Sequence, residues 1–268
     1  MGKTSSDSVL VHYDVSGTGT PVLMLLPQSS GPAGRRLFFD GFAQHHRLVT
    51  YDQRGTGKSS PANKPLSMQQ QAQDAIAVLD DARIDKAHLV CHSTGCGIGL
   101  ALASAHPQRV SSLTLINPWT HGDAYLRTTQ RLRIAAARAL DPEQYARFNA
   151  ALLFPPAYRR EYESGFEQQA ARAVHHPHNA IIIEQRLEAI LAFDARPLLA
   201  EISQPALVVS ARDDQLMPEW FAQVLATSLP HATWESFDGG GHMLPETRTQ
   251  AIVSTTLIHL KQVDMTHR

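Results

Sequence analysis

The chain has 268 residues and contains little of several features that mark specialised classes of protein. Its two cysteines, Cys91 and Cys96, are too few to hold a scaffold of this size by disulfides, and they lack the partner residues of a zinc site. No apolar run approaches the roughly 18 residues of a membrane span. The polar start, Met1 to Ser8, has no apolar segment like that of a signal peptide. These absences predict a globular protein of the cytoplasm with no membrane partner.

An excess of one charge is also missing, because 24 Lys and Arg stand against 25 Asp and Glu. A nucleic-acid partner is therefore not expected, since domains that bind polyanions usually carry a basic surplus. Hydrophobic residues make up 43% of the chain, which is ample for a core. The composition favours a protein that acts on a small molecule, and it leaves open whether the chain forms a homodimer.

Two motifs resemble cofactor sites, but both are incomplete. His175, His176 and His178 have no companion carboxylate or cysteine motif, so we expect a solvated helix end and not a metal site. The run from Gly55 to Ser59 resembles the end of a phosphate-binding loop, but Asp52 occupies the position of the first glycine of that motif. We expect a tight turn there, and we predict no metal and no cofactor.

The hydrophobic pattern alternates strands with helices in both halves of the chain. Short apolar runs predict strands, and helical spacing with Ser67 as an N-cap predicts a helix over 67–82. This order is typical of a doubly wound, mostly parallel sheet with helices on both faces, an α/β fold. The predicted strands are 9–15, 21–26, 47–51, 87–91, 112–116, 206–210 and 233–237, and the other predicted helices are 93–105, 218–228 and 245–260.

Strand signals vanish between residues 119 and 196, where Ala-, Arg- and Glu-rich helical stretches take over. This block predicts a helical cap inserted into a core made of residues 1–118 and 197–268. It should lie over the carboxyl edge of the sheet, where open α/β sheets bind ligands. All its basic residues are arginines, which suits solvated helix faces, with an anionic ligand as the alternative.

Three polar residues follow directly on predicted strands in the order that one mechanism requires. Ser93 lies on the turn between the strand at 87–91 and the next helix, and such a turn lifts a hydroxyl above the sheet. Serine needs a base, and the base needs an acid that orients it. Asp214 follows the strand at 206–210, and His242 follows the strand at 233–237. The sequence therefore predicts a catalytic triad of Ser93, His242 and Asp214.

With these motifs the chain resembles the α/β-hydrolase superfamily over nearly its whole length. The run from Tyr51 to Gly57 is similar to that of proline iminopeptidases and of aminoacrylate hydrolases, and Leu153–Pro155 resembles the latter. Two positions depart from the family pattern. Cys91 stands where the elbow usually begins with glycine, and Pro27–Ser29 replaces the common His-Gly of the oxyanion loop.

The resemblance implies an oxyanion hole made of two backbone N–H groups. One would come from Thr94, directly after the nucleophile, and the other from Ser29, with Gln28 as the alternative, because Pro27 has no N–H. Gln28, Ser30 and Trp119 are the predicted substrate-binding residues. Trp119 follows the strand at 112–116, and it could form a pocket wall or a hinge to the cap.

The leading hypothesis is a serine hydrolase that cleaves a small ester, lactone, amide or carbamate-like bond through an acyl-enzyme. A second reading is a cofactor-independent, ring-cleaving dioxygenase of the same fold, with His242 as the base. A third reading is a ligand-binding protein with slow turnover, like the hormone receptors of this superfamily. The cap should determine specificity, and it carries no motif that identifies the substrate.

Overall fold

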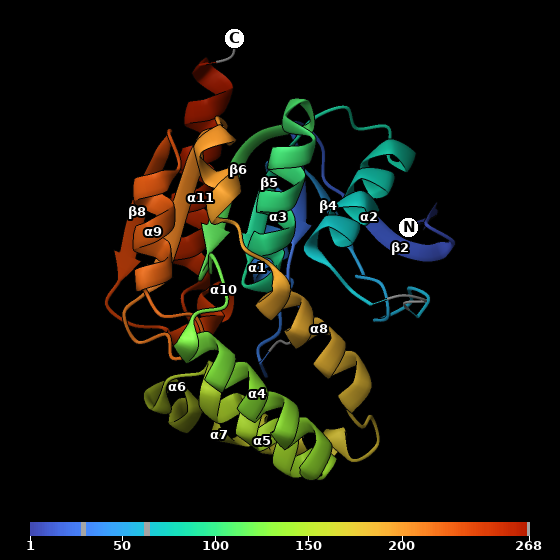
Figure 1. Ribbon diagram of the computed structural model, residues 1–268, viewed down its shortest axis with the longest axis vertical. Helices are drawn as coiled ribbons and strands as arrows, with labels where there is room; N and C mark the ends of the chain where they lie inside the picture. The colour runs from blue at the N-terminus through green and yellow to red at the C-terminus, as the bar shows by residue number, and fades with distance from the viewer. Residues whose placement is uncertain (28–30, 62–64, 267–268) are drawn as a thin grey trace.

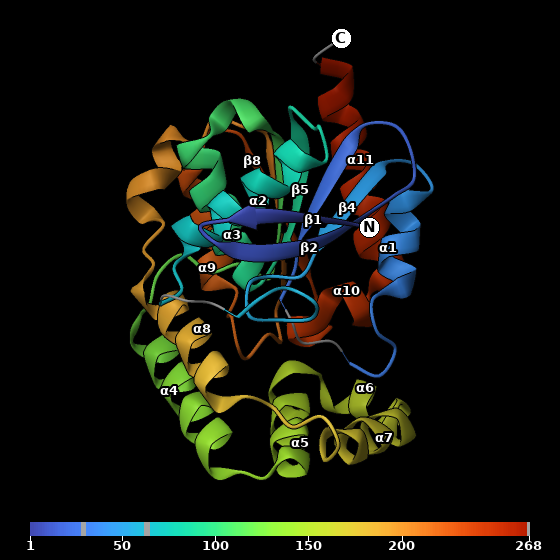
Figure 2. The same cartoon turned by 90° about the vertical axis from the view of Figure 1, so that its right-hand side faces the viewer.

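The computed structural model describes residues 1–27, 31–61 and 65–266. These residues form an eight-stranded sheet with helices on both faces (Figures 1 and 2). The strands are β1 (Gly2–Ser6), β2 (Val9–Ser16), β3 (Pro21–Leu25), β4 (Arg47–Tyr51), β5 (Ala87–His92), β6 (Val110–Ile116), β7 (Ala206–Ala211) and β8 (Ala232–Phe237).

The strands lie in the order β1-β2-β4-β3-β5-β6-β7-β8. β2 pairs antiparallel with β1 and β4, and the other neighbouring strands pair in parallel. The sequence prediction of a doubly wound, mostly parallel sheet is therefore confirmed. Because the parallel strands run in one direction, the residues that follow β5, β6, β7 and β8 meet at the same edge of the sheet.

Two hydrophobic clusters cover the two faces of the sheet. In β3, Leu23 and Leu25 join one cluster and Val22 and Met24 join the other, as the alternation of side chains along a strand requires. The first cluster packs against α2 (Met68–Asp81), α3 (Thr94–Ala105) and α9 (Trp220–Ser228). The second packs against α1 (Arg36–Ala43) and α11 (Thr249–Thr266), which lie side by side on the opposite face (Figure 2).

Between β6 and β7 the chain forms five helices that lie beyond one end of the sheet (Figure 1). Asp123, Asp141 and Asn179 cap the N-termini of three of them by accepting hydrogen bonds from backbone N–H groups in the first turn. α4 packs along α8, and α5 packs along α7. The five helices are α4 (Ala124–Ala139), α5 (Pro142–Leu153), α6 (Pro156–Glu161), α7 (Glu163–Ala173) and α8 (Ala180–Ala192).

The structure also contains elements that the sequence patterns do not predict. The edge strand β1 is polar, and α1 buries only Phe38 and Phe42, so neither has a strong periodic signal. The prediction of a single C-terminal helix over 245–260 is wrong. The segment forms two helices, α10 (Leu244–Thr247) and α11, because the backbone of Arg248 leaves the helical region with φ −134° and ψ 34°. α9 begins at Trp220, two residues later than predicted.

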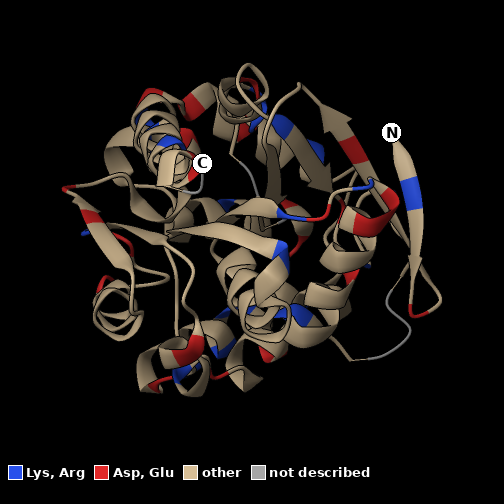
Figure 3. Ribbon diagram, turned by 90° about the horizontal axis from the view of Figure 1, so that it is seen from above, with Lys and Arg blue, Asp and Glu red and all other residues tan. Residues whose placement is uncertain are grey.

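Charges of both signs are distributed over the elements in Figure 3. Many surface arginines are neutralised by a carboxylate, as in the ion pairs Arg138–Glu184, Arg147–Glu167 and Arg212–Asp238. Such exposed pairs contribute less than about 1 kcal/mol each, so they balance the surface more than they stabilise it. In the described part of the chain, no helix combines the length and the apolar character needed to cross a bilayer.

Buried histidines make the fold sensitive to acid. Burial lowers the pKa of His259 on α11 to about 4, helped by the nearby ring of His88. A histidine in the unfolded chain binds its proton near pH 6.5. The free energy of unfolding should therefore be undiminished above that pH and should fall as the pH drops toward 4. The shift corresponds to a loss on the order of 3 kcal/mol. Urea unfolding of the wild type and His259→Gln at pH 7.5 and 4.5 measures it.

The variant should lose less stability than the wild type between the two pH values. His175→Gln, at an exposed histidine, should lose as much as the wild type. An equal loss in the wild type and His259→Gln would contradict the prediction.

Candidate active site

Ser93 lies on a strained turn between β5 and α3. Its backbone has φ 54° and ψ −118°, a region that residues with a side chain rarely adopt. The turn requires glycine two residues later, because a Cβ at Gly95 would lie 1.7 Å from the carbonyl oxygen of Leu25. The close approach of α3 to β3 thus fixes the position of the Ser93 hydroxyl, as the sequence pattern of an elbow predicts.

The departure from glycine at Cys91 is compensated within α3. A Cβ on Gly99 would lie 2.5 Å from the Cys91 Sγ, so the missing side chain at 99 makes room for the thiol. Burial raises the pKa of the Cys91 thiol, which keeps it protonated and unreactive. Cys91 is therefore a packing residue beneath the turn.

The side chains of Ser93, His242 and Asp214 form a continuous series of hydrogen bonds. The Ser93 Oγ lies 2.7 Å from His242 Nε2, and His242 Nδ1 lies 2.8 Å from Asp214 Oδ2. All three residues are nearly inaccessible to solvent. The structure thus brings together three residues that the sequence places 121 and 28 positions apart (93 to 214, and 214 to 242).

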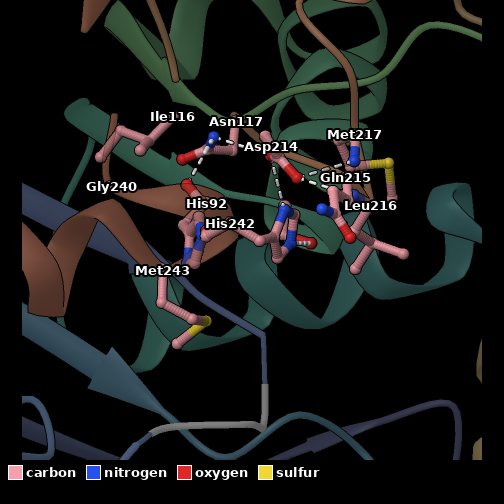
Figure 4. A network of polar contacts seen from close by, with 12 residues as sticks. His92, Ile116, Asn117, Asp214, Gln215, Leu216, Met217, Gly240, His242 and Met243 are labelled. Carbon is pink, nitrogen blue, oxygen red and sulfur yellow. Dashed lines mark hydrogen bonds and ion pairs between the residues drawn. The ribbon is translucent and has the colours of Figure 1, made fainter. Parts of the chain in front are cut away.

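Four N–H groups hold the Asp214 carboxylate (Figure 4). Oδ1 accepts from the backbone of Leu216 at 2.8 Å and Met217 at 3.0 Å. Oδ2 accepts from the His242 ring and, at 2.8 Å, from Asn117 Nδ2. The carboxylate held in this way orients the imidazole with its proton on Nδ1.

The neighbouring carboxylate, Asp213, holds the loop that carries the histidine. It accepts from the backbone N–H of Gly241 at 2.8 Å and of Gly240 at 3.2 Å. Both glycines have positive φ values, 138° at Gly240 and 63° at Gly241, which favour glycine. The two adjacent aspartates therefore have different roles, since Asp214 orients the His242 ring and Asp213 fixes the loop that carries it.

His92 supports the base from the opposite side. Its Nε2 lies 2.7 Å from the carbonyl oxygen of His242, so Nε2 must carry the proton and donate it. The two rings lie 5.3 Å apart (Figure 4). Burial, and then the nearby His242, lower the pKa of His92, which keeps this ring neutral beside the candidate base.

Glu246 on α10 connects three segments around the site. It accepts hydrogen bonds from the backbone N–H of Gly31 at 2.6 Å and of Ala33 at 3.0 Å, in the loop after β3. It also accepts one from the Tyr158 hydroxyl of α6 at 3.4 Å. A side chain at position 31 would strike this carboxylate, since a Cβ there would lie 2.3 Å from Glu246 Oε1.

A cavity of about 250 Å³ opens above Ser93. Ser93, Thr94 and His242 lie at its base, together with Leu216, Met217 and Met243 from the same edge of the sheet. Its opposite wall comes from α4, α5 and α8, through residues such as Tyr145, Leu153 and Leu187. The lining combines apolar side chains with polar and charged groups, among them Arg133, His178 and Arg186.

Of the other predicted site residues, the structure places one in the cavity and one outside it. Thr94 lines the cavity at the first position of α3. Trp119 does not line it, because the ring is fully buried and packs edge-on against Phe193 near the end of α8. The structure therefore does not place Trp119 in the wall of this cavity, and its role as a hinge to the cap stays a prediction. Gln28, Ser29 and Ser30 lie outside the described residues.

Sequence reasoning missed several residues of the site. His178 was expected at a solvated helix end, but it lines the cavity and lies against Tyr145, with ring centroids 4.1 Å apart and the rings tilted by 32°. Asn117 directly follows β6, so the rule that singled out Ser93, Asp214 and His242 could have found it. Glu246 carries no such signal, since its two shortest hydrogen bonds come from backbone N–H groups more than 200 residues away.

A buried serine hydroxyl bonded to histidine and carboxylate, above the edge of a mostly parallel sheet, is typical of hydrolases that use a serine nucleophile. Comparison with known families agrees with this class. The sequence model of the family described as "alpha/beta hydrolase fold" matches residues 26–249. The chain belongs to this family, and it is a hydrolase.

Several curated relatives carry the printed name "Putative carbamate hydrolase RutD". The protein from Azorhizobium caulinodans is 35% identical over 232 residues, which cover 87% of this chain and 88% of that protein. The protein from Caulobacter vibrioides is 32% identical over 257 residues, with 91% and 94% of the two chains covered.

Solved structures share the fold over almost the entire chain. The enol-lactonase from Burkholderia xenovorans LB400 superimposes with a TM-score of 0.84 at 22% identity, covering 97% of this chain and 100% of that one. The esterase from Exiguobacterium antarcticum gives a TM-score of 0.84 at 21% identity, with 97% and 100% covered. At this level of identity the likeness concerns the fold.

Replacing His92 tests whether its hydrogen bond positions the base. His92→Leu removes the donor to the His242 carbonyl and leaves that oxygen unpaired in a buried site. We expect kcat to fall about 10-fold or more, with a smaller change in KM, because a lost buried hydrogen bond costs about 1–3 kcal/mol. His92→Gln, which restores an N–H donor, should recover part of kcat. Equal rates in the wild type and His92→Leu would contradict the positioning role.

Replacing Glu246 tests the anchoring of the loop after β3. Glu246→Ala leaves the N–H groups of Gly31 and Ala33 without their acceptor, so we expect kcat for an activated ester to fall about 10-fold. Glu201→Ala, at an exposed glutamate shortly before β7, is the control and should leave kcat unchanged. A Glu246→Ala enzyme with the wild-type kcat would show that the loop needs no such anchor.

Proposed function

We propose that this protein is a serine hydrolase that cleaves a carbamate-like bond in a small molecule, with Ser93 as nucleophile, His242 as base and Asp214 as orienting acid. One observation carries the proposal. A continuous Ser93–His242–Asp214 hydrogen-bond series, with bonds of 2.7 and 2.8 Å, lies at the base of a cavity of about 250 Å³.

The proposed reaction has two halves that use the same groups. His242 Nε2 takes the proton of Ser93 as Oγ attacks the substrate carbonyl, and then gives this proton to the leaving group as the bond breaks. The product of this half is an acyl or carbamoyl ester on Ser93. Water then attacks that ester with His242 as base, and Ser93 regains its proton. Asp214 stays ionised and stabilises the imidazolium in both halves.

The developing oxyanion requires backbone donors near Ser93. The N–H of Thr94 is the proposed first donor, because Thr94 begins α3 beside the nucleophile and lines the cavity. Ser29, or Gln28 in its place, remains the proposed second donor. The Glu246 carboxylate, which holds the same loop at Gly31 and Ala33, supports this assignment. Each donor can lower the barrier by roughly 3 kcal/mol.

Residues 119–196 are proposed as a lid domain over this site, and residues 1–118 and 197–268 as the catalytic core. Support comes from α4, α5 and α8, which supply the wall of the cavity opposite Ser93. The carbamate-like bond is proposed first because of the printed name of the relatives that are 30–35% identical. Ester, lactone and amide bonds are open to the same chemistry.

In the alternative of a ring-cleaving dioxygenase, His242 would act as a base on the substrate itself, and Ser93 would form no covalent bond. The contact between the Ser93 Oγ and His242 Nε2 favours the hydrolase, because it prepares the hydroxyl for attack. The receptor reading requires negligible turnover, which kinetics on the same substrates measures directly.

Ser93→Ala tests the proposal. Hydrolysis of an activated carbamate ester and of p-nitrophenyl acetate should fall by at least about 1,000-fold, since the nucleophile acts as a unit with its base. A fluorophosphonate probe should label the wild type at Ser93 and leave the variant unlabelled. Ser228→Ala, at an exposed serine, should keep the wild-type rate and labelling. Wild-type turnover by Ser93→Ala would refute the proposal.

A further inference from the structure

Two arginines reach the cavity above Ser93 from neighbouring helices. Arg133 belongs to α4 and Arg186 to α8, and these helices pack along each other. Both side chains line the same cavity as Ser93 and His242. The site therefore contains two fixed positive charges beside the candidate nucleophile.

Neutral amide oxygens are the hydrogen-bond partners of both guanidinium groups. Arg133 Nη1 donates to Gln130 Oε1 at 3.0 Å, and Arg186 Nη2 donates to Gln53 Oε1. The Nε of Arg133 is buried and has no hydrogen-bond partner in the described part of the chain. Several N–H donors are thus left for a bound molecule, since each guanidinium carries five.

No carboxylate neutralises this pair among residues 1–27, 31–61 and 65–266. By contrast, the buried Arg54 is paired with a carboxylate, since its Nε lies 2.7 Å from Asp74 Oδ2. The remaining residues, 28–30, 62–64 and 267–268, contain no Asp or Glu. Arg35, which also influences Arg186, has Glu246 as its nearby acid.

The electrostatics of the pair are unfavourable in the absence of an anion. Burial lowers the pKa of Arg186 to about 10, with the positive charges of Arg35 and Arg133 acting in the same direction and Tyr51 acting against them. Burial also lowers the pKa of Arg133, and the nearby Tyr145 acts in the opposite direction. Buried charges normally have a partner of opposite sign, because desolvating an unpaired ion is costly.

We propose that Arg133 and Arg186 bind a carboxylate of the substrate, so that the substrate is a small organic acid whose carboxylate is separate from the bond that is cleaved. This inference rests on the proposed function and names its substrate class. A planar guanidinium binds a carboxylate through two parallel hydrogen bonds, which fixes both position and orientation. Two such groups on the lid side would hold the acid end while Ser93 attacks the carbonyl at the other end.

Arg186 is oriented for this task by the core and not only by its own helix. The Gln53 side chain that accepts from Arg186 also donates, through Nε2, to the carbonyl oxygen of Leu26 at 3.0 Å. Leu26 directly follows β3, at the start of the loop whose N–H groups Glu246 holds. The carboxylate subsite is therefore linked to the loop beside the nucleophile through one glutamine.

A pair of esters of similar size separates charge recognition from catalysis. Mono-p-nitrophenyl succinate carries a free carboxylate, whereas p-nitrophenyl butyrate does not. We expect the wild type to prefer the succinate in kcat/KM. Arg133→Met or Arg186→Met should lower the ratio of the two kcat/KM values about 10- to 100-fold, the size expected for losing charged hydrogen bonds. Arg186→Lys should restore part of the ratio.

Arg131→Met is the matched control, because Arg131 is exposed on the same helix as Arg133. It should leave both kcat/KM values as in the wild type. The inference is overturned if the wild type does not prefer the succinate, or if Arg133→Met and Arg186→Met lower kcat/KM equally for both esters.

Binding to an inactive enzyme tests the subsite without turnover. In Ser93→Ala, titration calorimetry with malonate at constant ionic strength should show one site, and the added Arg133→Met and Arg186→Met substitutions should weaken it at least 10-fold. If malonate does not bind to Ser93→Ala, the carboxylate subsite is refuted whatever the kinetics show. If malonate binds there but the wild type cleaves neither ester, the subsite stands and the proposed hydrolysis fails.

Discussion

The Asp214 carboxylate is the interaction on which the geometry of the site depends. Its four hydrogen bonds come from its own loop after β7, from Asn117 after β6 and from His242 after β8. One side chain thus joins the ends of three neighbouring parallel strands. Because every acceptor direction is used, a movement of any strand end would cost a buried hydrogen bond, and the imidazole stays aligned with Ser93.

Around this centre, the chain repeatedly accepts conformations and charges that lower its stability. Ser93 has a strained backbone, and Arg133 and Arg186 are desolvated with no carboxylate beside them in the described part of the chain. Each feature costs free energy in the folded state, and each lies at the cavity or directly beneath it. The large apolar clusters on the two faces of the sheet offset these costs.

The sequence predicted what local patterns encode. Apolar runs located the inner strands, and the rule that ligands lie at the ends of parallel strands identified Ser93, Asp214 and His242, which the structure brings within hydrogen-bond distance. The pattern could not reveal Glu246 or the pairing of Arg133 with Arg186. The Glu246 bonds depend on how α10 lies against the loop after β3, and the arginine pair depends on how α4 packs along α8. Neither arrangement has a local signal in the sequence. The edge strand β1 escaped notice because its residues are polar.

The three bonds of Glu246 differ in strength, and this has a mechanical consequence. Its bonds to the backbone of Gly31 and Ala33 are 2.6 and 3.0 Å long, whereas its bond to the Tyr158 hydroxyl of α6 is 3.4 Å long and therefore the weakest. A displacement of α6 breaks the tyrosine bond first and leaves the loop after β3 in place. The hydrogen bonds that hold the loop beside Ser93 therefore do not depend on the position of α6.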